Sequence, residues 1–316
     1  MTGPAMTVNP FALPEDPERE TPPLNCRSKH SSSPECYVDV GDAFQNFASF
    51  EKRLERLGRL QETGLFVPVG GPSGSGKTSL INRCAARALD LLKEQGISAE
   101  PINLTGEGRN TRLTVEQRTG RVGGKLVREL QQRSSVFVKT KYTEPLTEPD
   151  TLPDLQAWMS AAHQAMNENS VAVVRTPSTE LLDEIAIYWS GVYPRMLVFT
   201  ESPGEGVDKS FDGTSWEQTD TAEWLYLEGR FIENGEVLTF IKKRLDIPGK
   251  GTTFPDLDLD SFDGFFGGGN LATVGAAQSL LYRVYQHGLQ EGWRAATMVT
   301  AGHLGEFIRE AEGSTG

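Results

Sequence analysis

Cysteine, histidine and long apolar runs are all scarce in this sequence. Its 316 residues include three cysteines and four histidines, which are too few and too scattered for a disulfide framework or a histidine-based catalytic site. No stretch approaches the roughly 18 consecutive apolar residues that a membrane-spanning helix needs. The N-terminus lacks the basic and apolar blocks of a signal peptide. We therefore expect a cytoplasmic protein without a membrane partner.

Recognisable metal-binding patterns are also missing. Cys26, His30 and Cys36 match no standard zinc spacing and lack a fourth ligand. The acidic residues of segment 256–263 alternate like the start of an EF-hand loop, but the terminal glutamate is not at the proper spacing. We expect neither segment to bind a metal ion.

Positive charge is scarce overall and concentrated in one segment. The net charge of −12 excludes a protein that coats nucleic acid with its whole surface, because such binding requires Lys and Arg to neutralise phosphates. Segment 109–141, however, holds nine basic and two acidic residues, a balance of +7 that leaves −19 for the rest. This segment could contact nucleic acid, or it could be a solvated helix face or dock on the protein's own acidic C-terminal region. The candidate nucleic-acid residues are Arg112, Arg118, Arg121, Lys125 and Arg128.

The distribution of proline and the apolar periodicity divide the chain into three parts. Residues 1–36 contain seven of the 18 prolines, and we expect a tail that is disordered or extended on a partner. Residues 37–230 alternate strand-like and helix-like segments and predict an α/β domain. Residues 231–316 have only helical patterns and predict a small α-helical lid domain.

The pattern of the middle part predicts a mostly parallel sheet covered by helices on both faces, with ligands at the carboxyl ends of the strands. The expected strands are 65–69, 98–104, 136–141, 171–175, 195–200 and 224–227. The expected helices are 44–60, 77–95, 114–132, 154–167 and 179–188, followed in the lid by 236–246, 271–287 and 300–311. Glycines at 120, 123 and 124 should interrupt the helix 114–132 and suit a mobile loop.

The most specific motif lies in the segment LFVPVGGPSGSGKTSL, residues 65–80. An apolar strand runs into Gly-x-x-x-x-Gly-Lys-Thr and then into a helix, which is the context that a phosphate-binding loop requires. Lys77 would bridge the β- and γ-phosphates, and the Thr78 hydroxyl would bind Mg²⁺. The predicted cofactor-binding residues are Gly71, Pro72, Ser73, Gly74, Ser75, Gly76, Lys77, Thr78 and Ser79.

Hydrolysis requires carboxylates at the ends of neighbouring strands, to hold Mg²⁺ and to orient the attacking water. Strand 171–175 is followed instead by Thr176 and Pro177. Strand 195–200 ends at Thr200 and is followed by Glu201, which is the one candidate catalytic carboxylate.

The whole arrangement resembles the AAA+ ATPases of the initiator-like branch over residues 38–311. The resemblance is carried by the phosphate loop, the strand WLYLE at 224–228, the helix at 236–244 with Phe240, Ile241 and Arg244, and the helical lid. It implies a P-loop NTPase fold that binds ATP and Mg²⁺, with a homo-oligomer or a protein effector as partner.

The resemblance also implies three departures from an active ATPase. The strand ending at Thr176 would be the Walker B strand, and it has lost both acids, whereas the strand ending at Thr200 would be the sensor strand. The lid helix opens with GNLAT at 269–273 and has no arginine there. Segment 202–221 contains Lys209 as its only cation, so it offers no arginine finger.

These departures favour a nucleotide-dependent switch or assembly scaffold with slow or absent hydrolysis. The alternative is an active ATPase that uses Glu201 or groups from another subunit. Such an ATPase could form an oligomeric ring that acts on DNA through segment 109–141. A small-molecule kinase is a third hypothesis, disfavoured because the helical domain follows the sheet instead of interrupting it.

Overall fold

The computed structural model describes residues 5–12, 18–20, 23–24, 37–107, 112–145, 153–202, 220–229, 236–245, 254–261, 273–294 and 298–313. They form two compact units. The α/β unit comprises residues 45–72 and 80–227. The helical unit comprises residues 1–44, 73–79 and 228–316, and so includes most of the phosphate loop.

The α/β unit is built on a five-stranded sheet in the order β2-β3-β4-β1-β5, in which every neighbouring pair is parallel. The strands are β1 (Leu65–Gly70), β2 (Ser98–Asn103), β3 (Ser170–Arg175), β4 (Met196–Glu201) and β5 (Leu225–Tyr226). The three central strands are almost wholly buried, as expected for a parallel sheet covered on both faces. The predicted α/β fold of a P-loop NTPase is confirmed.

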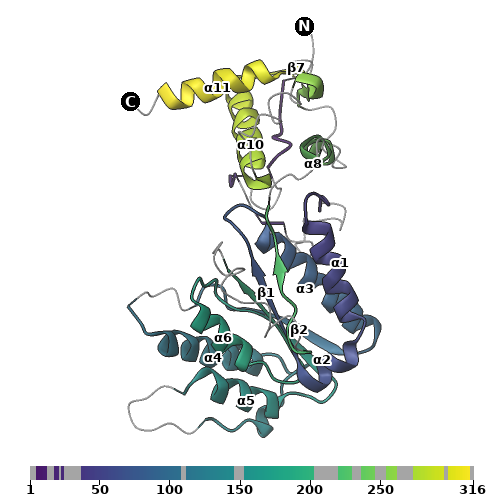
Figure 1. The fold of residues 1–316 in the computed structure, drawn as a ribbon, viewed down its shortest axis with the longest axis vertical. Coiled ribbons are helices and arrows are strands. Elements are labelled where there is room, and N and C mark those ends of the chain that lie inside the picture. Colours follow the sequence, from purple (N-terminus) through teal and green to yellow (C-terminus); the bar gives the residue numbers. More distant parts are fainter. Residues whose placement is uncertain are drawn as a thin grey trace. The chain divides into compact units, whose positions relative to one another are not determined.

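Helices cover both faces of this sheet (Figure 1). The helices α1 (Ala43–Leu54) and α3 (Lys77–Glu94) lie on one face, and α2 (Leu57–Thr63) leads directly into β1. The helices α4 (Val115–Gln131), α5 (Leu155–Ala165) and α6 (Leu182–Ser190) lie on the other face. The main core forms there, where Phe66, Val174 and Val198 of the sheet join the same buried cluster as Leu126 and Met159.

Helix α4 is continuous, so the prediction that glycines would interrupt it was wrong. A Cβ added to Gly123 would lie 2.7 Å from Cβ of Trp158, and one added to Gly120 would lie 2.7 Å from the Pro153 carbonyl oxygen. The glycines therefore allow α5 and the residues before it to pack directly against the α4 backbone. This contact offsets the helix-propensity cost of about 1 kcal/mol for each glycine.

The predicted strand at 136–141 was also wrong. This segment contains the single turn η2 (Lys139–Lys141) and one isolated bridge between Phe137 and Met166. Its backbone instead pairs with the end of α5, since the Val138 N–H donates to the Ala165 carbonyl. Val136 and Phe137 are buried in the main core, which explains their strand-like apolar character.

The helical unit contains α8 (Glu236–Leu245), α10 (Val274–Gln290) and α11 (Ala301–Gly313). A short parallel pair, β6 (Asp256–Leu257) and β7 (Met298–Val299), was not predicted. The core of this unit is formed by buried side chains from every one of these elements, including Phe240, Leu257, Leu281, Val299 and Leu304. Among the residues that the structure describes, no helix is long and apolar enough to cross a membrane.

Part of the N-terminal tail is packed into the helical unit, which differs from the disordered or extended tail that we expected. Met6 and Phe11 are buried in the core of this unit, and the Phe11 ring lies 5.4 Å from the Tyr285 ring between centroids. Gln278 of α10 donates to the Phe11 carbonyl at 2.6 Å. These contacts were missed because they join residues more than 260 positions apart in the sequence.

Candidate functional site

The phosphate loop connects β1 to α3, and its backbone conformation requires glycine at several positions. Gly71, Gly74 and Gly76 have φ angles of 136°, 78° and 93°, in the region where a side chain causes strain. No atom lies within 4 Å of a Cβ built on Gly76, so the loop has an open side at that position. An open, glycine-lined loop at a helix N-terminus fits the phosphates of a nucleotide.

Polar side chains are buried within this loop. Lys77 is 4% exposed and Ser75 is 6% exposed, and the Ser75 hydroxyl has no hydrogen-bond partner among the described residues. Buried polar groups of this kind are normally paired. The α3 N-terminus adds a partial positive charge at the same place. The loop therefore has the electrostatic character of an anion site.

Other segments of the helical unit contact the loop residues that belong to it. The Gly275 N–H, in the first turn of α10, donates to the Gly74 carbonyl at 3.1 Å. Gly229 packs so closely that a Cβ there would lie 2.2 Å from Cβ of Ser75. From the N-terminal tail, the Leu24 N–H donates to the Ser79 hydroxyl at 3.0 Å. The loop residues thus contact three segments that are distant in sequence.

The N-terminus of α10 is saturated by contacts within the chain. The Val274 N–H donates to the Gly229 carbonyl, and the Thr273 hydroxyl caps the helix by accepting from the Ala276 N–H at 3.1 Å. Since Gly275 is also engaged, α10 supports the loop through its backbone. The start of the predicted lid motif, residues 269–272, lies outside the described residues.

Two hydroxyl groups lie in hydrogen-bond contact at the carboxyl ends of β3 and β4. Thr176 Oγ1 and Thr200 Oγ1 lie 2.7 Å apart, and the two residues are 2% and 0% exposed. These are the residues that the resemblance assigns to the Walker B and sensor positions. A buried pair of neutral hydroxyls that satisfy each other has neither the charge to hold Mg²⁺ nor the basicity to activate water.

Glu201 is the last residue of β4 and is half-buried. It pairs in register with Val69 of β1, and its carbonyl accepts from the Thr179 N–H at 3.0 Å. Among the strands that the structure describes in this sheet, β4 alone ends in a carboxylate. Glu201 therefore lies at the carboxyl edge of the sheet, and its catalytic role stays a prediction.

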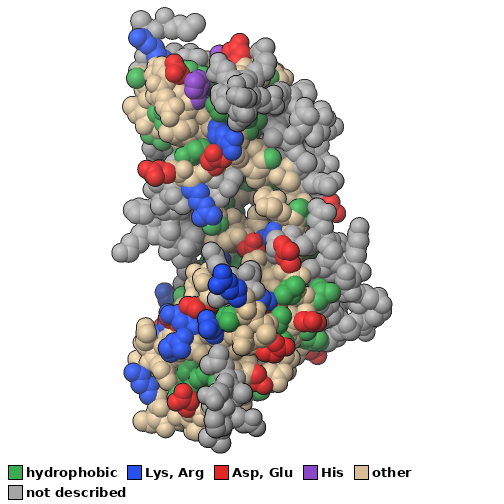
Figure 2. Space-filling model, turned by 90° about the vertical axis from the view of Figure 1, so that its left-hand side faces the viewer, with side chains coloured by type: hydrophobic (Ala, Val, Ile, Leu, Met, Phe, Trp, Pro, Cys, Tyr) green, Lys and Arg blue, Asp and Glu red, His purple; other side chains and the backbone are tan. Residues whose placement is uncertain are grey.

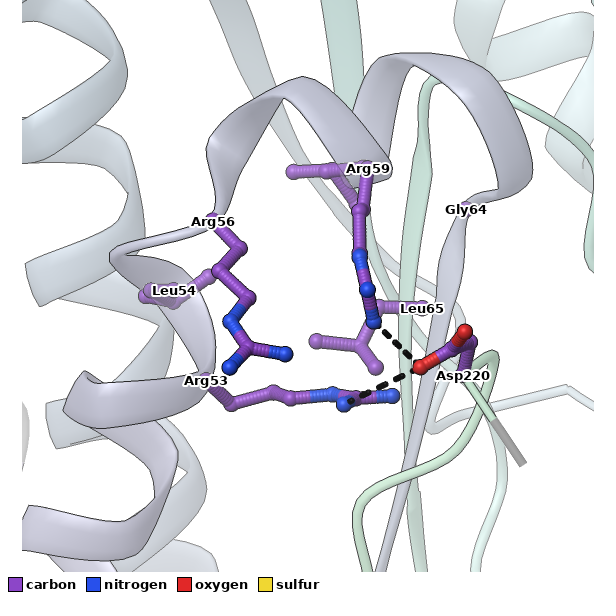
Figure 3. Close-up of a pocket in the computed structure, with 8 residues that line it drawn as sticks. Arg53, Leu54, Arg56, Arg59, Gly64, Leu65 and Asp220 are labelled. Carbon is purple, nitrogen blue, oxygen red and sulfur yellow. Dashed lines mark hydrogen bonds and ion pairs between the residues drawn. The ribbon is translucent and has the colours of Figure 1, made fainter. Parts of the chain in front are cut away.

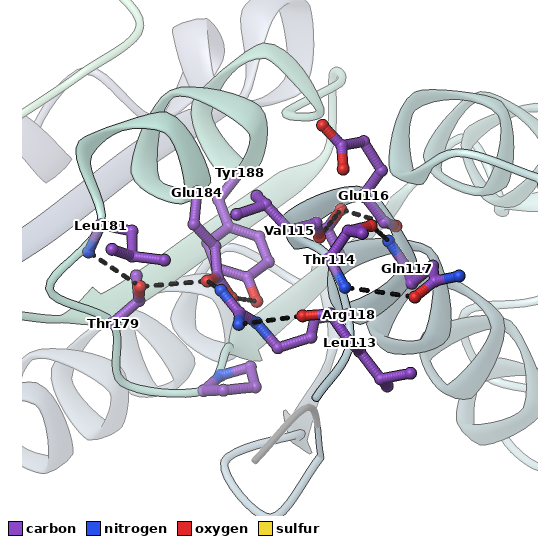
Figure 4. A network of polar contacts seen from close by, with 12 residues as sticks. Leu113, Thr114, Val115, Glu116, Gln117, Arg118, Thr179, Leu181, Glu184 and Tyr188 are labelled. Carbon is purple, nitrogen blue, oxygen red and sulfur yellow. Dashed lines mark hydrogen bonds and ion pairs between the residues drawn. The ribbon is translucent and has the colours of Figure 1, made fainter. Parts of the chain in front are cut away.

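A buried polar network holds the segment that follows β3 (Figure 4). The Glu184 carboxylate accepts from Arg118 Nη2 at 2.6 Å, and from the hydroxyls of Thr179 and Tyr188 at 3.1 Å each. Burial, together with the Glu184 charge, raises the pKa of Tyr188 far above its ordinary value, so this phenol stays a neutral donor. Arg118, a candidate nucleic-acid residue, is thus engaged in an ion pair in which both side chains are largely buried.

The other candidate nucleic-acid residues lie on or just before α4. Figure 2 shows one face of the molecule, on which several Lys and Arg side chains lie over the α/β unit beside Asp and Glu side chains. Arg112, Arg121 and Arg128 are exposed. Arg121 and Arg128 form no ion pair with another described residue. Lys125 pairs with Glu129 at 2.9 Å. Three of the five predicted residues therefore offer an exposed guanidinium group.

A separate hollow lies between α1, α2 and the start of β1 (Figure 3). It is lined by Arg53, Arg56 and Arg59, and the first and last of these pair with Asp220. The hollow adjoins Leu65, at the opposite end of β1 from the phosphate loop, and so is not part of that site.

The described part of the chain contains no cluster of potential metal ligands. No group of three or more His, Cys, Asp or Glu residues there could hold a metal ion. Cys26, His30 and Cys36 lie outside the described residues.

Comparison with known proteins identifies the fold. No protein-family model and no curated protein sequence matches the chain. The structure resembles the Aeropyrum pernix ORC2 protein, solved in ADPNP–ADP complexes, with a TM-score of 0.53, 12% identity, and coverage of 98% of this chain and 72% of that one. Cdc6p from Pyrobaculum aerophilum gives a TM-score of 0.45, 11% identity, and coverage of 83% and 66%. PCH-2 from C. elegans gives a TM-score of 0.37 at 10% identity, with coverage of 77% of this chain and 57% of that one. At 12% identity the likeness to the ORC2 protein shows the fold alone, and this fold is the AAA+ ATPase fold that the sequence resemblance predicted.

Proposed function

We propose that this chain binds ATP in its phosphate loop and acts as a nucleotide-dependent switch or assembly scaffold that hydrolyses ATP slowly or not at all. The buried hydroxyl pair of Thr176 and Thr200, 2.7 Å apart, is the single observation on which we base the slow or absent hydrolysis, because these residues stand where the resemblance implies the Walker B acids and the sensor residue. A second copy of the chain or a protein effector would be its partner.

Binding is supported by the loop itself. Gly71, Gly74 and Gly76 adopt the positive φ angles that an inward-facing loop needs, and Lys77 begins the helix that follows. The resembling ORC2 protein was solved with ADPNP and ADP. A lysine bound to phosphate makes charge-assisted hydrogen bonds, each worth about 1.5–3 kcal/mol.

A switch needs a link between the loop and the rest of the chain. The Gly74 carbonyl accepts from Gly275 of α10, and the Ser79 hydroxyl accepts from Leu24 of the N-terminal tail. A change in the loop on binding phosphates would alter both contacts. We therefore expect nucleotide binding to change the mobility of α10 and of the N-terminal tail. These two segments would together form the surface that binds a partner.

Equilibrium ATP binding and phosphate release, measured on the same preparations, test the proposal. We expect wild type to bind ATP, and Lys77→Ala to lose about 10- to 100-fold in affinity. Lys93→Ala, which removes an exposed lysine from the same helix, should bind like wild type. Turnover above about 1 s⁻¹ that is abolished by both Lys77→Ala and Glu201→Gln would contradict the switch and favour the active ATPase.

DNA binding through α4 is the second candidate function, and the exposure of Arg112, Arg121 and Arg128 favours it. Replacing all three by alanine should weaken DNA binding and reduce the slope of log affinity against log salt by about 2.7, since each phosphate contact contributes about 0.9. A matched variant that removes three exposed lysines elsewhere, Lys52, Lys242 and Lys243, should leave the slope unchanged. Equal effects in the two variants would remove α4 as the DNA site.

A further inference from the structure

Arg175 is the last residue of β3 and lies at the strand end where an ATPase needs an acid. Its Nη1 donates to Asn82 Oδ1 at 2.5 Å, and Asn82 is 8% exposed. Asn82 belongs to α3 and follows Thr78 by four residues. Residues four apart share one face of a helix and lie about 6 Å apart along its axis. The Arg175 guanidinium group is therefore held against the α3 face that carries Thr78 one turn earlier.

The pleat of the sheet explains why Arg175, and not Thr176, faces α3. Arg175 pairs in register with Phe199 of β4, and the Phe199 ring packs on Phe50 of α1 with centroids 5.7 Å apart. Helices α1 and α3 cover this same face (Figure 1). Because successive side chains of a strand alternate between faces, Thr176 points to the opposite face. The residue that takes the place of a metal-binding acid is thus a cation.

The residues at this strand end do not fit Mg²⁺. This ion requires oxygen ligands in near-octahedral geometry, whereas a guanidinium group offers five N–H donors and no acceptor. The positive charge of Arg175 would also repel a divalent cation. Among the described strands of this sheet, only β4 ends in a carboxylate, Glu201, so the strand ends supply at most one acid for a Mg²⁺ ion beside a nucleotide.

We infer that Arg175 supplies the positive charge that a divalent cation supplies in P-loop ATPases, so that this chain binds the phosphates of ATP without Mg²⁺. A guanidinium group matches phosphate oxygens through two parallel hydrogen bonds and stays charged at every working pH. The hydrogen bond to Asn82 fixes the group against α3. The inference rests on the proposed function, because it requires a nucleotide in the phosphate loop.

Calorimetric titration of the full chain with ATP, once with Mg²⁺ and once with excess EDTA, tests this inference. We expect the wild-type Kd in EDTA to stay within about threefold of the Kd in Mg²⁺, because Arg175, and not a metal ion, would neutralise the phosphates. Arg175→Ala should lose about 10- to 100-fold in EDTA, and Arg175→Asp should bind ATP only when Mg²⁺ is present. Arg87→Ala, which removes a partly exposed arginine of α3 that pairs with Glu51, should match wild type in both buffers.

Each outcome separates the two proposals. Wild-type binding that collapses in EDTA, with Arg175→Ala behaving like wild type, would overturn the role of Arg175 and leave ATP binding intact. No ATP binding in either buffer would overturn the proposed function together with this inference. Thermal melting of each variant without nucleotide shows whether it is folded, and the wild-type comparison stands on its own if Arg175→Ala or Arg175→Asp does not fold.

Discussion

The phosphate loop has the residues that an active ATPase requires, whereas the carboxyl ends of β3 and β4 lack most of them. The loop has its glycines in positive φ, its lysine and its supporting helix. The strand ends have Arg175 bonded to Asn82, and Thr176 bonded to Thr200, where acids would stand. Phosphate binding depends largely on backbone conformation, whereas hydrolysis depends on a few carboxylate side chains. Hydrolysis can therefore be lost through very few substitutions while phosphate binding is kept.

The two regions are also stabilised in different ways, which makes the comparison testable. The loop is held by backbone contacts with Gly229 and Gly275, which tolerate no added side chain. The segment after β3 is held by side chains, through the ion pair of Glu184 with Arg118. Substitutions at the glycines that contact the loop should therefore disturb nucleotide binding. Substitutions in the ion pair of Glu184 with Arg118 should disturb folding.

The largest effect is expected for Arg118→Ala. It leaves the Glu184 carboxylate buried without its cation, and breaking one side of a buried ion pair costs about 3–5 kcal/mol. Urea unfolding followed by circular dichroism measures the loss. Arg118→Met with Glu184→Gln removes both charges and keeps an amide oxygen that can accept from Tyr188 or Thr179, so it should recover part of the loss. An unfolding free energy that is unchanged in Arg118→Ala would show that the network of Figure 4 contributes nothing to stability.

A smaller effect is expected for Gly229→Ala, which tests the contact that supports the loop. Its Cβ would overlap Ser75, so we expect a loss of about 1–3 kcal/mol from overpacking, with about 1 kcal/mol more from the φ of +66°. Gly292→Ala is the matched control, because its φ is +67° and nothing lies within 4 Å of the added Cβ. Only Gly229→Ala should also weaken ATP binding. Equal losses of stability in the two variants, with ATP binding intact, would show that the loop does not need this contact.

The sequence predicted the parts of both regions that depend on local pattern. The buried runs of β1, β3 and β4 follow from consecutive apolar residues, and the phosphate loop follows from its motif. The absence of acids after β3 was also visible. The sequence could not show that Arg175 faces α3 and that Thr176 meets Thr200, because that depends on strand register and on which helices cover each face.

The errors have a related cause. Glycines at 120, 123 and 124 indicated a break in the helix, but their close contacts with Pro153 and Trp158 exist only in the folded unit. Val136 and Phe137 have the character of a strand because they are buried, yet they pack beside α5. The local sequence shows that a residue is apolar or small. Which secondary structure that residue adopts depends on the distant segments that pack against it.

The smallest effect is expected for the hydroxyl pair at the strand ends. Thr176→Val should cost about 1–3 kcal/mol of unfolding free energy, since it leaves the buried Thr200 hydroxyl without its partner. Thr200→Val should cost less, because Thr176 Oγ1 can still donate to the Phe199 carbonyl at 3.3 Å. The double variant should be close to wild type, because both polar groups are then replaced by methyl groups of similar shape. A double-mutant cycle by urea unfolding measures this coupling. ATP binding should not change in any of the three variants if the strand ends have no part in holding the nucleotide. A double variant that loses ATP binding while keeping its stability would instead place these hydroxyls in the nucleotide site, and the contrast between a binding loop and closed strand ends would no longer hold.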